Sequence, residues 1–128
     1  MREQYHSISS PYDILSLSIS VDKEDCFSSY LNWYNERLEV TPNNFKLWYS
    51  LATLYYNHKK FTEAEQAYKT VIKYNPNFQQ AYLKIAFIYC FKLNRDSEAV
   101  EWAKKAKSMN ESDYFASLVI SLCHKDIP

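Results

Sequence analysis

Apolar residues in the middle of the chain recur at helical spacing. The first set stands at i, i+3, i+4 and i+7 and consists of Trp48, Leu51, Ala52 and Tyr55, which places it on one face of an α-helix. A second set with similar spacing begins with the last residue of the short link NHKKFTEA and consists of Ala64, Ala67, Tyr68, Val71 and Ile72. The pattern therefore predicts two antiparallel helices joined by a short turn.

The pattern returns 34 residues further along the chain. The chemical type is kept in the pairs Pro42 and Pro76, Trp48 and Tyr82, Leu51 and Ile85, Ala52 and Ala86, Leu54 and Ile88, and Tyr55 and Tyr89. The same step backwards carries Ala64 and Tyr68 onto Tyr30 and Tyr34, so a degenerate copy precedes the two clear ones. A fixed period of this length is the signature of a helical solenoid.

These residues resemble the tetratricopeptide repeat, whose pattern is W-x2-L-G-x2-Y…A-x3-F…P. The first clear copy matches through Trp48, Leu51, Ala52, Tyr55, Ala64, Tyr68 and Pro76. In place of the glycine stands Ala52, a small residue that lets two helices cross closely. The looser second copy keeps Tyr82, Ile85, Ala86, Tyr89, Ala99 and Ala103, with Glu111 in place of the closing proline. The resemblance implies an all-α, helix-turn-helix solenoid.

The expected organisation is an N-terminal extension, 1–10, followed by a single domain, 11–128. Within that domain we expect a degenerate repeat at 11–44, clear repeats at 45–78 and 79–110, and a capping helix at 111–125. Residues 14–21 leave an alternative open, because apolar residues alternate with serines there, as in a strand. Ser10, Pro11 and Asp13 favour a short helix instead.

Helix ends are predicted from their polar residues. With no glycine in the chain, asparagine is expected at left-handed helix ends, at Asn57, Asn75, Asn94 and Asn110. Thr62 and Glu65 have the spacing of a capping box. On the outer helices, Glu65 with Lys69 and Glu101 with Lys105 are expected to be solvated charges spaced i, i+4. The terminal helix should open near Asp113 and cover the last repeat with Phe115, Leu118, Val119 and Leu122.

Composition excludes several classes of function. Fifteen basic residues balance fifteen acidic ones without clustering, so we expect no nucleic-acid partner. The longest apolar-rich stretch is too short to span a bilayer, so no membrane insertion is expected. The lack of glycine removes the phosphate-binding loop, the dinucleotide fingerprint and the nucleophile elbow. With His6, His58 and His124 far apart, we expect no enzyme, no catalytic residues, no cofactor and no metal site.

The three cysteines, Cys26, Cys90 and Cys123, lie far apart in the sequence. No C-x-x-C motif joins any two of them. We interpret them as separate buried thiols, typical of a reducing compartment. This interpretation predicts a cytoplasmic protein.

The first helices of stacked repeats line the concave wall of such a solenoid. Off their core stripe lie Tyr49, Thr53, Tyr56, Leu83, Phe87, Cys90 and Phe91. One interpretation is that this second stripe packs against neighbouring helices. The other is a peptide-binding groove, formed by Tyr49, Thr53, Tyr56, Leu83, Phe87 and Phe91, with Lys46, Lys84 and Lys92 orienting the peptide. A third is that the chain's own Tyr5 and Ile8 fill it.

The function expected from the resemblance is protein–protein interaction, as an adaptor, scaffold or chaperone-like module. One branch of the family grips the acidic tail of heat-shock chaperones with Lys, Asn and Arg on the inner face. This chain carries Tyr49, Thr53, Leu83 and Phe87 at the matching places, so we expect no such tail as partner. Self-association stays open. The alternative is a structural subunit of a larger assembly with no free groove.

Overall fold

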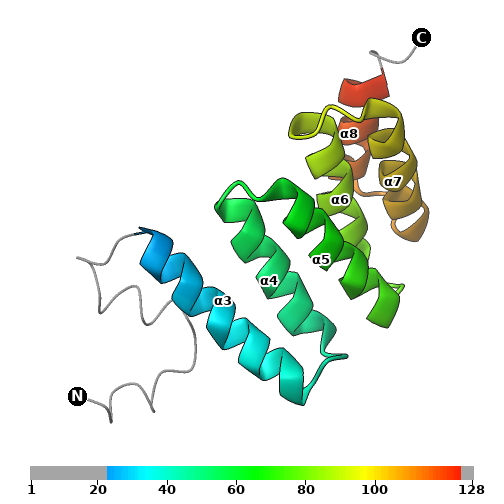
Figure 1. The fold of residues 1–128 in the computed structure, drawn as a ribbon. Helices are drawn as coiled ribbons and strands as arrows, with labels where there is room; N and C mark the ends of the chain where they lie inside the picture. Colours follow the sequence, from blue (N-terminus) through cyan, green and yellow to red (C-terminus); the bar gives the residue numbers. More distant parts are fainter. Residues whose placement is uncertain (1–22, 125–128) are drawn as a thin grey trace. The chain divides into compact units, whose positions relative to one another are not determined.

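The computed structural model describes residues 23–124, with side chains from Cys26 to Cys123. Within that range every regular element is an α-helix. The helices are α3 (Lys23–Val40), α4 (Phe45–Asn57), α5 (Phe61–Tyr74), α6 (Gln79–Phe91), α7 (Asp96–Met109) and α8 (Tyr114–His124) (Figure 1). No strand occurs among the described residues. The predicted all-α class is confirmed. The N-terminal extension and the helix-or-strand alternative at 14–21 lie outside the described residues.

The chain divides into two compact units at Pro42. In the first unit, α3 buries Cys26, Tyr30, Tyr34 and Leu38. These residues are spaced by four, so one face of the helix carries them. The two tyrosines are those that the 34-residue shift aligns with Ala64 and Tyr68 of the clear repeat.

The second unit, Asn43–Pro128, holds two helical hairpins and a final helix. Each helix from α4 to α8 packs against the next along the chain, and α6 also contacts α8. Small residues lie where the helices approach closely: Ala52, Ala64, Ala81, Ala86, Ala99 and Ala103 are all fully buried. Tyr68, Ile85, Ile88 and Tyr89 fill the space between them.

Polar side chains begin two of these helices. The side chain of Asn44 accepts hydrogen bonds from the backbone N–H groups of Lys46 and Leu47, at 3.1 and 3.3 Å. Asp113 does the same for Phe115 and Ala116, at 2.8 and 3.2 Å. Each cap satisfies N–H groups that have no partner within the first turn.

The asparagines lie at or after helix ends, as predicted, but only one of the four has the predicted left-handed conformation. Asn94 has a φ of 55°, but the other left-handed residue among those described is Lys59, with a φ of 60°. Asn75 and Asn110 are extended, with φ of −144° and −150°, and Asn57 is the last residue of α4. The turn after α4 continues for two residues, because Lys60 N–H donates to the carbonyl of Tyr55 and closes a Schellman motif around Lys59.

Two expectations about Glu65 are wrong. Helix α5 begins at Phe61 and has no side-chain cap, so Thr62 already lies inside its first turn and forms no capping box. Glu65 is also not one of the solvated charges on the outer helices, because it is buried. Its carboxylate accepts a hydrogen bond from the hydroxyl of Tyr89 on α6. Tertiary packing between α5 and α6 thus overrides the local capping pattern.

The prediction of three separate thiols is wrong for two of them. A disulfide joins Cys90 on α6 to Cys123 on α8, with the Cα atoms 6.0 Å apart. Cys26 is free and buried. The two cysteines lie 33 residues apart, nearly one repeat, so the stacking of repeats brings equivalent positions together. The disulfide also removes the basis for expecting a reducing compartment.

Candidate functional site

Aromatic side chains from three helices surround a hollow beside α6. We call this hollow the α6 groove, with a volume of about 320 Å³. It is lined by Tyr56 from α4, by Gln79, Gln80, Leu83, Lys84 and Phe87 from α6, by Asp113, and by Phe115 from α8. All of these residues belong to the second unit.

Phe87 is the centre of the aromatic surface. Its ring lies 6.2 Å from that of Tyr56, 4.7 Å from that of Phe91 and 6.1 Å from that of Phe115, between ring centroids. The rings of Phe87 and Phe115 are nearly parallel, at 22°. Phe91 is 44% exposed and Phe115 is 41% exposed, so the cluster presents apolar surface to solvent.

The predicted groove residues divide into two groups. Tyr56, Leu83 and Phe87 line the α6 groove, and Phe91 lies beside it against Phe87. Tyr49 and Thr53 lie outside the lining. The ring of Tyr49 packs against Tyr68 and Phe78 at 5.3 and 5.1 Å.

The hydroxyl groups of Tyr49 and Thr53 are hydrogen-bonded to residues of neighbouring helices. The hydroxyl of Thr53 lies 3.1 Å from that of Tyr68, and the hydroxyl of Tyr49 donates to Gln80 Oε1 at 3.3 Å. Burial raises the pKa of Tyr49, and it raises the pKa of Tyr68 to about 12. These phenols therefore stay neutral at ordinary pH and act as uncharged packing groups.

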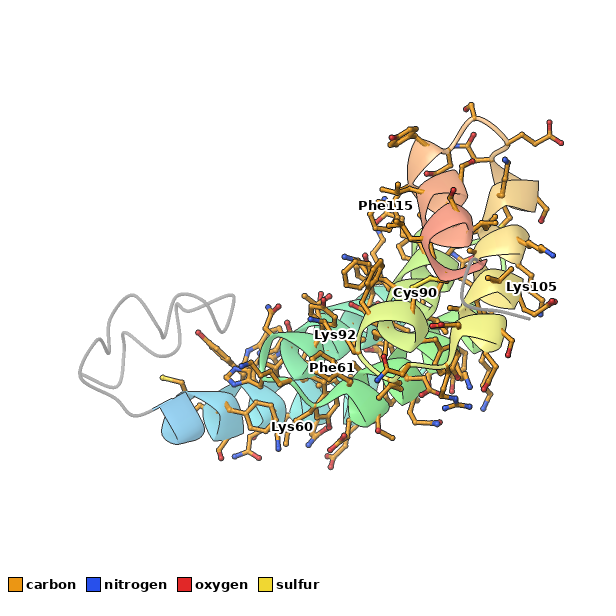
Figure 2. All side chains as sticks on the ribbon, turned by 90° about the horizontal axis from the view of Figure 1, so that it is seen from above. Lys60, Phe61, Cys90, Lys92, Lys105 and Phe115 are labelled. Atoms are coloured by element: carbon orange, nitrogen blue, oxygen red, sulfur yellow. A yellow bond between two sulfur atoms is a disulfide. The ribbon has the colours of Figure 1, made fainter. Side chains whose placement is uncertain are left out.

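The lysines predicted to orient a peptide also differ in position. Lys84 lines the α6 groove. The ammonium of Lys92 lies 5.9 Å from the centre of the Tyr56 ring and 5.4 Å from that of Phe61; Figure 2 labels Lys92 and Phe61 next to each other. Lys46 is exposed and is not among the lining residues.

Sequence reasoning missed the wall on the α8 side. Phe115 was assigned to the covering face of the terminal helix, together with Leu122, but both are about 40% exposed. The residues of α8 that do cover the repeat are Ala116, Val119 and Cys123. Phe115 directly precedes Ala116 in the sequence, so the two residues lie on different sides of the helix. This offset from the buried residues was the available signal that Phe115 does not face the last repeat.

Asp113 has both carboxylate oxygens engaged. Oδ1 caps α8, and Oδ2 accepts a hydrogen bond from Gln79 Nε2 at 2.7 Å. The hydrogen bond from Gln79 is the main cause that lowers the pKa of Asp113, with the two backbone N–H groups adding to it. The groove thus carries one carboxylate and one ammonium, that of Lys84, and no excess of either charge among its lining residues.

Neither metal chemistry nor a membrane span is indicated in the described part of the chain. From 23 to 124, no three His, Cys, Asp or Glu side chains gather as metal ligands would. Over the same range, no helix combines the length and the apolar character needed to cross a bilayer.

Paired antiparallel helices stacked with a period near 34 residues define a helical-repeat protein. Two family profiles, both described as tetratricopeptide repeat, match residues 45–78 and 79–113. Together they cover more than half of the chain, which therefore belongs to the tetratricopeptide repeat family.

Solved structures share this fold. The Arabidopsis OM64 TPR domain is 20% identical, with a TM-score of 0.71 over 82% of this chain and 86% of that one. The second TPR domain of human RPAP3, in complex with the HSP70 peptide SGPTIEEVD, is 19% identical, with a TM-score of 0.72 over 91% and 94%. The first TPR of Spaghetti (RPAP3), bound to the HSP90 peptide SRMEEVD, is 17% identical, with a TM-score of 0.71 over 91% of each chain. At these identities the likeness concerns the fold.

Proposed function

We propose that this chain is a protein-interaction module that binds a peptide segment of a partner in the α6 groove. The observation that carries the proposal is the exposed aromatic cluster of Phe87, Phe91 and Phe115 beside a hollow of about 320 Å³. Pockets that bind ligands are mostly apolar with a few placed polar groups. The groove has this character, with Tyr56 and Leu83 as further apolar walls.

The peptide anchor is expected to be an apolar side chain seated against Phe87. Aromatic residues commonly dominate the binding energy of protein interfaces. The polar groups at the rim, Gln80 and Lys84, can hydrogen-bond peptide carbonyls. Because the lining carries one positive and one negative group, the net charge of the peptide should matter less than its apolar anchor.

Two of the similar structures hold acidic heat-shock peptides, so those peptides are natural competitors in the test. In this chain Leu83 and Phe87 occupy the groove wall, and Asp113 presents a carboxylate to it. A peptide with several acidic residues would meet one ammonium among the lining residues, that of Lys84, and the carboxylate of Asp113 would offset that attraction. We therefore expect SGPTIEEVD and SRMEEVD to bind more weakly than an apolar peptide.

The test begins with selection of binding peptides from a random nine-residue phage library, followed by fluorescence anisotropy with the labelled peptide. Replacing a hot-spot anchor with alanine typically costs about 2 kcal/mol or more, which is a loss of affinity of about thirtyfold. We expect Phe87→Ala to cause this loss while the helical circular dichroism stays unchanged. Phe45→Ala is the matched control, because Phe45 packs against Phe78 outside the groove.

Two results would count against the proposal. If Phe87→Ala unfolds the protein as readily as truncation of the buried Tyr89, then Phe87 is a core residue and the groove is not a free surface. If the variant stays folded and binds the selected peptide with unchanged affinity, the peptide binds elsewhere.

A structural role in a larger assembly is the second candidate, and two exposed apolar residues of α8 that do not line the groove favour it. Tyr114 is 78% exposed and Leu122 is 40% exposed, so this helix offers apolar surface outside the groove. A partner whose capture is lost in Tyr114→Ala and Leu122→Ala, but kept in Phe87→Ala, would support this second function.

A further inference from the structure

Helix α8 is fastened to α6 at both of its ends. At the start of α8, Gln79 Nε2 of α6 donates to Asp113 Oδ2 at 2.7 Å, and the same group also donates to the carbonyl of Ala106 on α7 at 3.2 Å. At its last turn, the disulfide joins Cys123 to Cys90 of α6. Phe87 lies between Gln79 and Cys90 in the sequence of α6. Likewise, Phe115, whose ring contacts that of Phe87, lies between Asp113 and Cys123. Figure 2 labels Cys90 on α6 and Phe115 on α8.

Apart from these fastenings, little joins α8 to α6, because α8 packs mainly against α7. Helix α8 is 11 residues long, and helices below about 12–15 residues are marginal on their own in water. Two of its three buried residues, Ala116 and Val119, have small side chains. Because burial stabilises in proportion to apolar area, these two contribute modestly, and the third buried residue is Cys123 itself. The disulfide therefore accounts for a large share of the attachment of α8 to α6.

We propose that the Cys90–Cys123 disulfide is a reversible latch on the α6 groove. A dithiol reductant opens the latch, α8 loosens from α6, and the groove loses the wall that Phe115 provides. Peptide affinity then falls. This inference rests on the proposed function, because it names the regulation of that same groove.

The exchange balances with a dithiol as the electron donor. One thiolate of the dithiol attacks Sγ of Cys90, which is partly exposed, whereas Cys123 is fully buried. The bond between the two cysteine sulfurs breaks, and the Cys123 thiolate leaves and takes a proton. The second thiolate of the reductant then displaces Cys90. Two electrons and two protons pass to the protein, and the dithiol ends as its own disulfide.

The first experiment needs no peptide. Hydrogen exchange of the full chain is followed by mass spectrometry with and without dithiothreitol, in Cys26→Ala, so that no third cysteine can exchange. We expect the amides of α8 to exchange at least tenfold faster after reduction, while those of α4 and α5 stay unchanged. The double variant C90S/C123S should resemble the reduced form in both conditions. Equal protection of α8 in the oxidised and reduced forms would overturn the latch.

The second experiment measures binding of the fluorescein-labelled peptide selected against the oxidised protein. Reduction should raise the Kd at least tenfold in Cys26→Ala and leave the Kd of C90S/C123S unchanged. Faster exchange in α8 without a change in Kd would show that the latch does not control the groove and would overturn that part of the inference. Absence of any binding peptide would instead contradict the proposed function, and the exchange experiment would still decide whether α8 is released.

Discussion

Three side chains converge on the buried carboxylate of Glu65. The hydroxyl of Tyr89 donates to Oε1, the ammonium of Lys69 lies 2.9 Å from the same oxygen, and Arg95 lies 3.8 Å from Oε2. Burial alone would raise the pKa of Glu65, but the hydrogen bonds from Tyr89 and Lys69 and the two positive charges outweigh it, so its pKa is lowered. Glu65 thereby ties α5 to α6 and to the turn before α7.

This network predicts an acid-sensitive contribution to stability. A carboxyl group with a lowered folded-state pKa stabilises the fold above its ordinary value of 4.5, and the contribution disappears as the pH falls through the folded-state pKa. We expect Glu65→Gln to lower the unfolding free energy at pH 7 by about 1–3 kcal/mol. The difference from the natural protein should shrink below about pH 4.5.

Urea melts from pH 7 down to pH 3 measure this effect. The matched control is Glu98→Gln, because Glu98 pairs with Arg95 on the exposed surface. Exposed ion pairs contribute about 0–1 kcal/mol, so this control should change the unfolding free energy little. A deficit in Glu65→Gln that stays constant over the whole pH range would show that the ionised carboxylate is not the stabilising form.

The close helix crossings give a second prediction at the residue scale. Ala52 and Ala86 are 0% exposed, so extra side-chain atoms at either position must displace their neighbours. We expect Ala86→Leu to lower the unfolding free energy by about 1–3 kcal/mol through overpacking. Denaturant melts with Lys84→Leu as the exposed control would measure this. An unchanged midpoint for Ala86→Leu would mean that the crossing has room to spare.

At the scale of elements, hydrophobic periodicity located the helices of the clear repeats because their buried faces repeat at i, i+3 and i+4. The helix ends were harder, since the left-handed residue after α4 is Lys59 and not an asparagine. At Lys59 the backbone hydrogen bonds of the Schellman motif hold the left-handed conformation, and a lysine can adopt it. The α8 wall of the groove was missed because a single repeat does not show which side of a terminal helix remains open.

The disulfide gives a prediction at this same scale. Cross-linking two residues 33 positions apart restricts the unfolded chain, and such links typically add about 2–4 kcal/mol. We expect C90S/C123S to lose stability in that range relative to the oxidised protein. Urea melts of Cys26→Ala with and without dithiothreitol should show the same loss. Identical midpoints in the two redox states would contradict the prediction.

For the whole second unit, the order of helices along the chain is also their order of packing. The 34-residue period was sufficient to predict this arrangement, because repeats of one hairpin bury their apolar faces only by stacking on each other. What the period could not supply is the pairing of Cys90 with Cys123 or the place of the groove. Both depend on how α8 ends the stack.

This linear arrangement predicts a graded stability. Helix α6 has neighbours in α5, α7 and α8 and carries the largest set of buried residues among the described helices of the second unit. We expect its amides to show the slowest hydrogen exchange, with protection decreasing towards α4 and α8, as local opening begins at poorly packed ends. Native-state exchange in oxidised protein would measure the gradient. Uniform protection across α4 to α8 would show that the unit opens as a single block.

The sequence separation of the two bonded cysteines also determines when their disulfide can form during synthesis of the chain. Hairpins made of neighbouring helices can close as soon as both helices have left the ribosome, and synthesis proceeds at about 5–20 residues per second. Cys90 must wait for a further 33 residues, which takes about 2–7 seconds at that rate. During that interval its thiol is unpaired next to Phe87 and Phe91, and the disulfide can form only after the last helix of the unit has been made.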